Sequence, residues 1–112
     1  MVMNLKKLEK NTVGIKIFIE KDGQELGRAW LYLIYNDLHV EPYGLLEDVF
    51  VKEDKRGQGV GKELLEKIIL EARERKCYKI IGTSRMSRDM VHEWYKRLGF
   101  REYGLEFRMD LK

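Results

Sequence analysis

Hydrophobic and polar positions alternate over residues 13–19, where branched apolar side chains occupy every second position. A period of two residues is typical of a β-strand with one buried face. Asp22-Gly23 follows and predicts a tight turn, because both residue types tolerate positive backbone φ angles. Residues 25–35 are almost wholly apolar and aromatic from Ala29 onward, which predicts a strand covered on both faces. The pattern therefore predicts a β-hairpin.

Strand and helix patterns alternate after this hairpin. Residues 45–51 predict a third strand, and residues 60–73 predict a helix whose apolar positions form one stripe. Residues 78–84 predict a short strand parallel to the third strand, because a helix connects the two. Residues 89–98 predict a second helix that ends at Gly99. We therefore expect a sheet with helices packed on it.

Residues 100–111 predict two final strands separated by Gly104, the second with alternating apolar and charged positions. The whole order is then strand, strand, strand, helix, strand, helix, strand, strand. It predicts an α/β fold of the α+β type, with a mixed, mostly antiparallel sheet of about six strands and two main helices. Because 112 residues suffice for one hydrophobic core but not for two, we expect a single domain over residues 1–112.

Charge and composition narrow the range of functions. The 22 Lys and Arg residues are interleaved with 19 Asp and Glu residues, which indicates a solvated surface rather than a nucleic-acid-binding face. The chain lacks an apolar run of about 18 residues, so we expect no membrane span. The single Cys77 cannot form a disulfide within the chain, which favours a cytoplasmic location. We expect Cys77 to pack at the start of a strand.

A glycine-rich loop leads from the third predicted strand into the first helix. Glycine occurs at positions 57, 59 and 61, where it lets the backbone approach a ligand closely. The first N–H groups of the helix lack intrahelical partners and lie at the positive end of the helix dipole, which predicts an anion site. The loop has neither the Walker spacing nor the dinucleotide-binding spacing. It therefore indicates a phosphate ligand of another class.

Arg56, Gly59 and Gly61 resemble the Arg/Gln-x-x-Gly-x-Gly/Ala signature of the GNAT N-acetyltransferase superfamily. Residues 94–100, WYKRLGF, are similar to the Tyr-x-x-x-Gly-Phe helix end of that family. The predicted order of elements after residue 11 also matches the family core. The resemblance implies an N-acetyltransferase that uses acetyl-CoA as co-substrate, without a metal. A primary amine would attack the thioester directly in a ternary complex.

The same resemblance implies that the N-terminal part of the family fold is abbreviated. The family begins with a strand and two helices that wall the acceptor site, whereas few residues precede the first strand here. Either the acceptor is small or a second subunit supplies the wall, so we expect a homodimer. A non-catalytic coenzyme A-binding module with a regulatory or interaction role is the alternative function. The acceptor stays open among polyamines, amino acids, aminoglycoside-like amines, protein N-termini and lysines.

The resemblance assigns the coenzyme contacts to the third strand and the loop. The loop backbone would hold the diphosphate, helped by the charges of Arg56 and Lys62. The pantetheine arm would pair with the third strand, and the amide of Phe50 or Val51 would stabilise the oxyanion. Arg88 stands where the family usually has Asn, and it could contact the 3′-phosphate. The expected cofactor-binding residues are Val49, Phe50, Val51, Arg56, Gly57, Gln58, Gly59, Val60, Gly61, Lys62 and Arg88.

Three residues are expected to catalyse the transfer. Glu47 and Asp48 are adjacent in the third strand, and regular alternation places them on opposite faces. The doublet is similar to the polyamine acetyltransferase branch, in which the Glu serves the amine, so we expect Glu47 to remove the amine proton with Asp48 as support. Tyr95 matches the family's Tyr and would protonate the leaving thiolate. The alternatives are surface carboxylates for the doublet and a packed aromatic ring for Tyr95.

Overall fold

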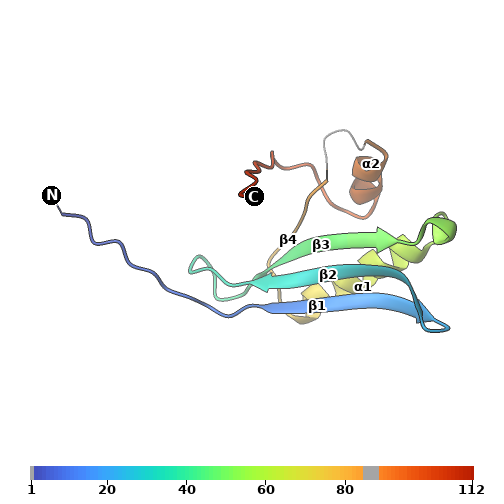
Figure 1. Ribbon diagram of the computed structural model, residues 1–112, viewed down its shortest axis with the longest axis horizontal. Coiled ribbons are helices and arrows are strands. Elements are labelled where there is room, and N and C mark those ends of the chain that lie inside the picture. The colour runs from blue at the N-terminus through green and yellow to red at the C-terminus, as the bar shows by residue number, and fades with distance from the viewer. Residues whose placement is uncertain (1, 85–88) are drawn as a thin grey trace. The chain divides into compact units, whose positions relative to one another are not determined.

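The computed structural model describes residues 2–84 and 89–112 (Figure 1). Within these residues the four strands form one sheet in the order β1-β2-β3-β4. The chain divides into two compact units, residues 1–81 and residues 82–112. The elements are β1 (Val13–Lys21), β2 (Gln24–Ile34), β3 (Tyr43–Val51), the short 3-10 helix η1 (Glu53–Lys55), α1 (Val60–Glu74), β4 (Ile80–Gly82) and α2 (Asp89–Arg97).

Strands β1 and β2 form the predicted hairpin. They pair antiparallel from Val13 opposite Leu33 to Lys21 opposite Gln24. The two turn residues, Asp22-Gly23, have φ angles of 53° and 76°. Positive φ at both central positions is typical of the type I′ turn, whose twist matches that of the flanking strands.

Strand β2 is buried on one face only. Gly27, Ala29, Leu31 and Leu33 are buried, whereas the residues between them are partly exposed. The prediction that both faces are covered is therefore wrong. The reason is that α1 packs against this sheet along one side, while the other side carries large aromatic residues that read as apolar in the sequence.

Helix α1 supplies the other half of the core. Its predicted apolar stripe is confirmed, because Leu64, Leu65, Ile68 and Ala72 are buried, whereas Glu66, Lys67 and Leu70 are exposed. Leu46 of β3 is buried as well, with 2% of its surface exposed. The α1 face of the sheet therefore holds the hydrophobic core of the first unit. No helix in the described part of the chain is long and apolar enough to cross a membrane.

Strand β4 lies beside the first part of β3. Gly44 N–H donates to the Lys79 carbonyl at 2.9 Å, and Tyr78 N–H donates to the Pro42 carbonyl at 3.1 Å. The bonded positions advance in the same direction along both segments, so the neighbours run parallel, as the sequence predicts. Continued in this register, β4 ends at Gly82 near the level of Glu47. The sheet is therefore mixed, and the second half of β3 extends beyond β4.

The second unit contains α2. Its last turn is closed by Phe100 N–H, which donates to the Tyr95 carbonyl at 3.1 Å, and by Gly99 with a φ of 101°. This confirms the predicted helix end. Residues 100–112 form no strand, and residues 101–112 are exposed, so the prediction of two final strands is wrong. Alternation specifies which side chains share a face, but a strand also needs a partner for its backbone hydrogen bonds.

Candidate functional site

The glycine-rich loop connects β3 to α1 by way of η1. Gly57 and Gly59 have φ angles of 79° and 83°, which other residue types rarely adopt. Gly59 caps α1 with its backbone, because Glu63 N–H donates to the Gly59 carbonyl at 3.0 Å. No side chain of Gly59 can cap the helix, and the first N–H groups have no carbonyl one turn earlier. The loop therefore presents amide donors at the positive end of the helix dipole.

The side chains of the loop hold its shape. Arg56 Nε donates to the Val51 carbonyl at 3.1 Å, and Gln58 Nε2 donates to the Asp54 carbonyl at 3.1 Å. Lys62 is exposed and lies 3.8 Å from Glu66 on the next turn of α1. Arg56 therefore fastens the loop to the end of β3.

Strand β3 contains a bulge at the predicted catalytic doublet. Phe50 lies opposite Arg28 of β2, but the next aligned pair is Glu47 opposite Trp30. Two residues of β3 therefore stand against one residue of β2. Asp48 lies in this interval with a φ of 50°, a left-handed conformation that is uncommon outside glycine.

The bulge places both carboxylates on the same face of the sheet. Glu47 lies opposite Trp30, and Asp48 makes an ion pair with Arg28, which precedes Trp30 by two positions on that face. The expectation that the doublet points to opposite faces is therefore wrong. Strict alternation requires a regular strand, and the extra residue interrupts it.

Arg28 is a residue that the sequence analysis missed. Its Nε donates to Asp48 Oδ2 at 2.8 Å, its Nη2 donates to Asp48 Oδ1 at 3.2 Å, and its Nη1 donates to Glu25 Oε2 at 3.1 Å. Glu25 also pairs with Lys16 of β1. The Arg28 guanidinium lowers the pKa of Asp48, and Lys16 followed by Arg28 lowers the pKa of Glu25. The available signal was an arginine within a mostly apolar strand.

The direction of the β3 amides follows from the hydrogen bonds at its end. Lys52 N–H donates to the Leu26 carbonyl of β2 at 2.8 Å. Because the N–H groups of a strand alternate between its two sides, the Val51 N–H points away from β2. The Val51 carbonyl points the same way, since it accepts Arg56 Nε. Val51 therefore directs its amide to the edge that extends beyond β4.

Of the other predicted residues, Tyr95 lies in the second unit, Cys77 lies in the first unit, and Arg88 is not among the described residues. Tyr95 of α2 is half-buried, and its ring centroid lies 5.5 Å from that of Trp94 and 5.4 Å from that of Phe100. Arg88 lies outside the described residues. Cys77 is half-buried just before β4, and burial raises the pKa of its thiol, which agrees with a packing role.

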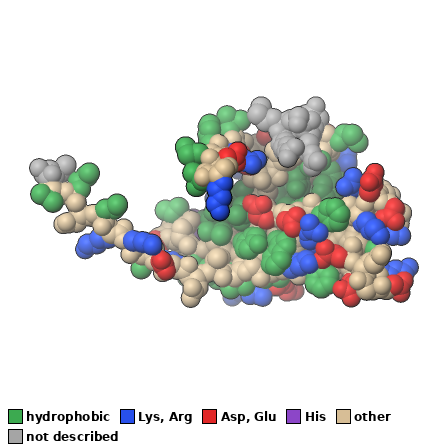
Figure 2. Space-filling model, in the orientation of Figure 1, with side chains coloured by type: hydrophobic (Ala, Val, Ile, Leu, Met, Phe, Trp, Pro, Cys, Tyr) green, Lys and Arg blue, Asp and Glu red, His purple; other side chains and the backbone are tan. Residues whose placement is uncertain are grey.

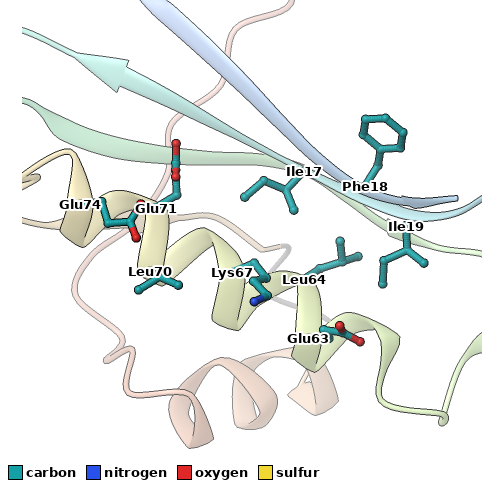
Figure 3. Close-up of a pocket in the computed structure, with 9 residues that line it drawn as sticks. All are labelled: Ile17, Phe18, Ile19, Glu63, Leu64, Lys67, Leu70, Glu71 and Glu74. Carbon is teal, nitrogen blue, oxygen red and sulfur yellow. The ribbon is translucent and has the colours of Figure 1, made fainter.

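A groove of about 330 Å³ lies between β1 and α1 (Figure 3). Ile17, Ile19 and Leu64 line it, with Glu63 and Lys67 among its charged residues. It contains none of the predicted site residues and belongs to the α1 side of the sheet, whereas Glu47 and Asp48 lie on the other side. On the face shown in Figure 2, acidic and basic side chains intermingle. Among the described residues, no group of three or more His, Cys, Asp or Glu side chains could hold a metal ion.

Comparison with known proteins gives consistent matches. Residues 14–102 match the family profile described as "Acetyltransferase (GNAT) domain". A glucosamine 6-phosphate N-acetyltransferase of Trypanosoma brucei brucei is 37% identical over 68 residues, covering 61% of this chain and 44% of that protein. An aminoglycoside N(6′)-acetyltransferase type 1 of Stenotrophomonas maltophilia is 30% identical over 96 residues, covering 81% and 63%. This chain therefore spans less than two thirds of either relative.

A solved structure shares the fold. The crystal structure of a Trypanosoma brucei acetyltransferase superposes with a TM-score of 0.77 at 30% identity, covering 89% of this chain and 69% of that one. The family match over residues 14–102 includes the hairpin, the bulged strand, the glycine-rich loop and α1.

Proposed function

Because the chain belongs to the GNAT acetyltransferase domain family, we propose that it transfers the acetyl group of acetyl-CoA to a primary amine by direct attack in a ternary complex. One observation carries this proposal: the edge of β3 that extends beyond β4 leads through Arg56 into the amide donors at the start of α1. Acetyl-CoA carries a thioester and a diphosphate, and each of these two groups needs hydrogen-bond donors at its own position. We also propose that residues 1–112 act as one acetyltransferase domain, since the family match crosses the boundary between the two units.

The loop would bind the coenzyme. The amides after Gly59 donate to the diphosphate, and Gly57, Gln58, Val60 and Gly61 shape the surface around it. The positive charges of Arg56 and Lys62 add attraction. The pantetheine arm pairs with β3 along Val49, Phe50 and Val51, and Arg88 contributes to the far end of the coenzyme.

The oxyanion donor of this proposal is the Val51 amide. Of the two amides expected from the sequence, Phe50 lies opposite Arg28 in a pair that bonds to β2, whereas Val51 points to the open edge. A backbone amide aimed at the thioester oxygen stabilises the charge that develops there. Because it is fixed before the reaction starts, it needs no reorganisation.

Glu47 would remove the proton of the attacking amine. An alkyl amine has a pKa near 10.4 and is mostly protonated at neutral pH, so it needs a base. Asp48 is bound by the guanidinium fork of Arg28, which stabilises its ionised form and makes it a poor base at neutral pH. Glu47 carries the base role, and Asp48 supports it.

Tyr95 would protonate the leaving thiolate. Tyr95→Phe keeps the aromatic ring that packs near Trp94 and Phe100 but removes the hydroxyl. We expect turnover to fall about tenfold or more, because a positioned acid contributes at least this much. The dissociation constant of coenzyme A should stay the same, and an unchanged turnover would assign the ring to packing alone.

We propose an amino sugar as the acceptor. Two relatives are named for glucosamine 6-phosphate and for aminoglycosides, both of which carry an amine on a sugar. The carboxylates of Glu47 and Asp48 on the open face would attract such a cation. We further propose a homodimer, because β1 is an edge strand of the sheet in the described residues and its Phe18 is exposed. We propose a cytoplasmic location on the ground of the single cysteine in the sequence. A monomeric mass in light scattering with full activity would contradict the dimer.

Two measurements test the function. Calorimetric titration with acetyl-CoA should show binding at micromolar to low millimolar concentration. A screen of amines by thiol release should then show turnover, with amino sugars above polyamines, amino acids and lysine peptides. Binding without turnover on any amine would instead indicate a coenzyme A-binding module. The absence of binding would reject both.

A further inference from the structure

The bulge of β3 lies beside a cluster that we name the Arg28 clamp, formed by Arg28, Asp48 and the ring of Phe50. Arg28 holds both carboxylate oxygens of Asp48, and its guanidinium carbon lies 4.6 Å from the centroid of the Phe50 ring. It therefore contacts the residues on both sides of Val49. The side chain of Arg28 is 29% exposed, and Glu25 fixes its remaining terminal nitrogen.

The clamp acts on the one residue of β3 outside glycine whose backbone φ is positive. Asp48 has a φ of 50°, and a non-glycine residue keeps such a conformation where its surroundings compensate for the cost. A bidentate guanidinium–carboxylate pair fixes a side chain more firmly than a single hydrogen bond. Among the described residues, the bidentate pair with Arg28 is the contact that acts directly on Asp48.

The bulge decides which amide reaches the open edge of β3. Gly44 N–H points toward β4, where it donates to Lys79. In a regular strand the N–H groups of residues 46, 48 and 50 would follow it, and Val51 would point back toward β2. One extra residue reverses this order, so that the Val51 amide faces the edge instead.

We infer that Arg28 is a positioning residue, which holds the bulge in the register that turns the Val51 amide toward the thioester. This inference rests on the proposed acetyl transfer. It separates the two carboxylates of the doublet, because Asp48 anchors the backbone while Glu47 serves the amine. Arg28 itself acts through Asp48 and Phe50 and does not contact the reacting atoms.

A double-mutant cycle tests the clamp. Arg28→Gln should lower kcat about tenfold to a hundredfold, because a displaced oxyanion donor affects the transition state. The KM for acetyl-CoA should change less than about threefold, since the loop is intact. In an Asp48→Gly background, glycine adopts the left-handed conformation without help, so adding Arg28→Gln should cost less than about twofold further.

Two control variants accompany the cycle. Arg28→Lys keeps the charge but loses the fork, and should restore part of the lost kcat. Arg75→Gln breaks a helix ion pair with Glu71, whose atoms lie 3.3 Å apart, and should leave kcat unchanged. An unchanged kcat in Arg28→Gln, or an equal loss in both backgrounds, would overturn the clamp.

A readout without catalysis separates this inference from the proposed function. In a ¹⁵N-labelled protein, Arg28→Gln should shift the amide resonances of Val49, Phe50 and Val51. It should also speed the hydrogen exchange of the Phe50 amide, which lies in a pair that bonds to β2. The same resonances should change little on adding Arg28→Gln to Asp48→Gly. If the wild-type protein transfers no acetyl group but the amides respond in this way, the clamp stands and the proposed reaction fails. Amides that do not respond would reject the clamp.

Discussion

The two halves of β3 differ in burial, in regularity and in their contact with β4. Residues 43–46 alternate half-buried and buried positions and pair with β2, with β4 bonded alongside at Gly44. Residues 47–51 contain the bulge, have no fully buried residue and extend beyond β4. A single strand therefore anchors the core with one half and exposes backbone donors and carboxylates with the other. Stability and chemistry should respond to different substitutions along it.

Of the substitutions that separate the two halves, Glu47→Gln should have the largest effect, and this effect should be on turnover. It changes an exposed residue of the second half, so the free energy of unfolding should stay within about 0.5 kcal/mol of the wild-type value. Loss of the general base should lower kcat about 10²- to 10⁴-fold at neutral pH. Steady-state thiol release measures this. Glu20→Gln, an exposed carboxylate of β1, is the matched control, and intact turnover in Glu47→Gln would remove Glu47 from the base role.

Leu46→Ala should show the opposite behaviour. Leu46 is 2% exposed, so truncation leaves a cavity in the core and should cost about 2–4 kcal/mol of unfolding free energy. Urea denaturation measures this cost. Phe50→Ala removes a larger side chain from the second half, but Phe50 is 36% exposed, so the cost in unfolding free energy should be smaller. A larger cost for Phe50→Ala would show that the two halves are not divided in this way.

Gly59→Ala tests the loop that follows the second half. An alanine Cβ would meet no atom within 4 Å, so the substitution strains only the backbone at a φ of 83°. We expect a loss of about 1 kcal/mol in stability from this strain. The added methyl group also lies where the diphosphate would approach, so the Kd of coenzyme A should rise about tenfold.

Gly23→Ala is the matched control for this loop. Gly23 has a φ of 76° in equally open space, but it lies in the hairpin turn between β1 and β2. The two alanine variants should lose a similar free energy of unfolding. Only Gly59→Ala should weaken the binding of coenzyme A, as measured by calorimetry. Equal Kd values would show that the diphosphate binds elsewhere.

The smallest expected effect is the loss, under acid conditions, of the stability that the ion pairs around Arg28 contribute. The guanidinium lowers the pKa of Asp48, so this carboxylate is ionised and stabilising above its unfolded pKa. The stabilisation is lost as the pH falls through the lowered pKa. The charged side chains that face Asp48 are Lys16 of β1, Glu25 and Arg28 of β2, and Glu47 of β3.

Thermal unfolding as a function of pH checks this prediction. The difference in Tm between the wild type and Asp48→Asn should be present at neutral pH and should shrink under acid conditions. A difference that grows on acidification would contradict the assigned pairing of Asp48 with Arg28.

Local patterns were sufficient for much of the first unit. The hairpin turn at Asp22-Gly23, the apolar stripe of α1 and the glycine-rich loop depend on residues close together in the chain. The last strands were predicted wrongly from the alternation over residues 105–111, since pairing depends on a distant partner. The face of Asp48 was also wrong, because a bulge is a property of two strands together.

The sequence by itself determined the strands and the helix of the first unit, the position of the glycine-rich loop and the resemblance to the acetyltransferase family, because each is encoded by neighbouring residues. Only the tertiary structure decided that Glu47 and Asp48 share a face, that Arg28 binds Asp48, and that Val51 directs its amide to the open edge. These features depend on how β2 is aligned against β3. One extra residue in that alignment changes the direction of every group that follows it.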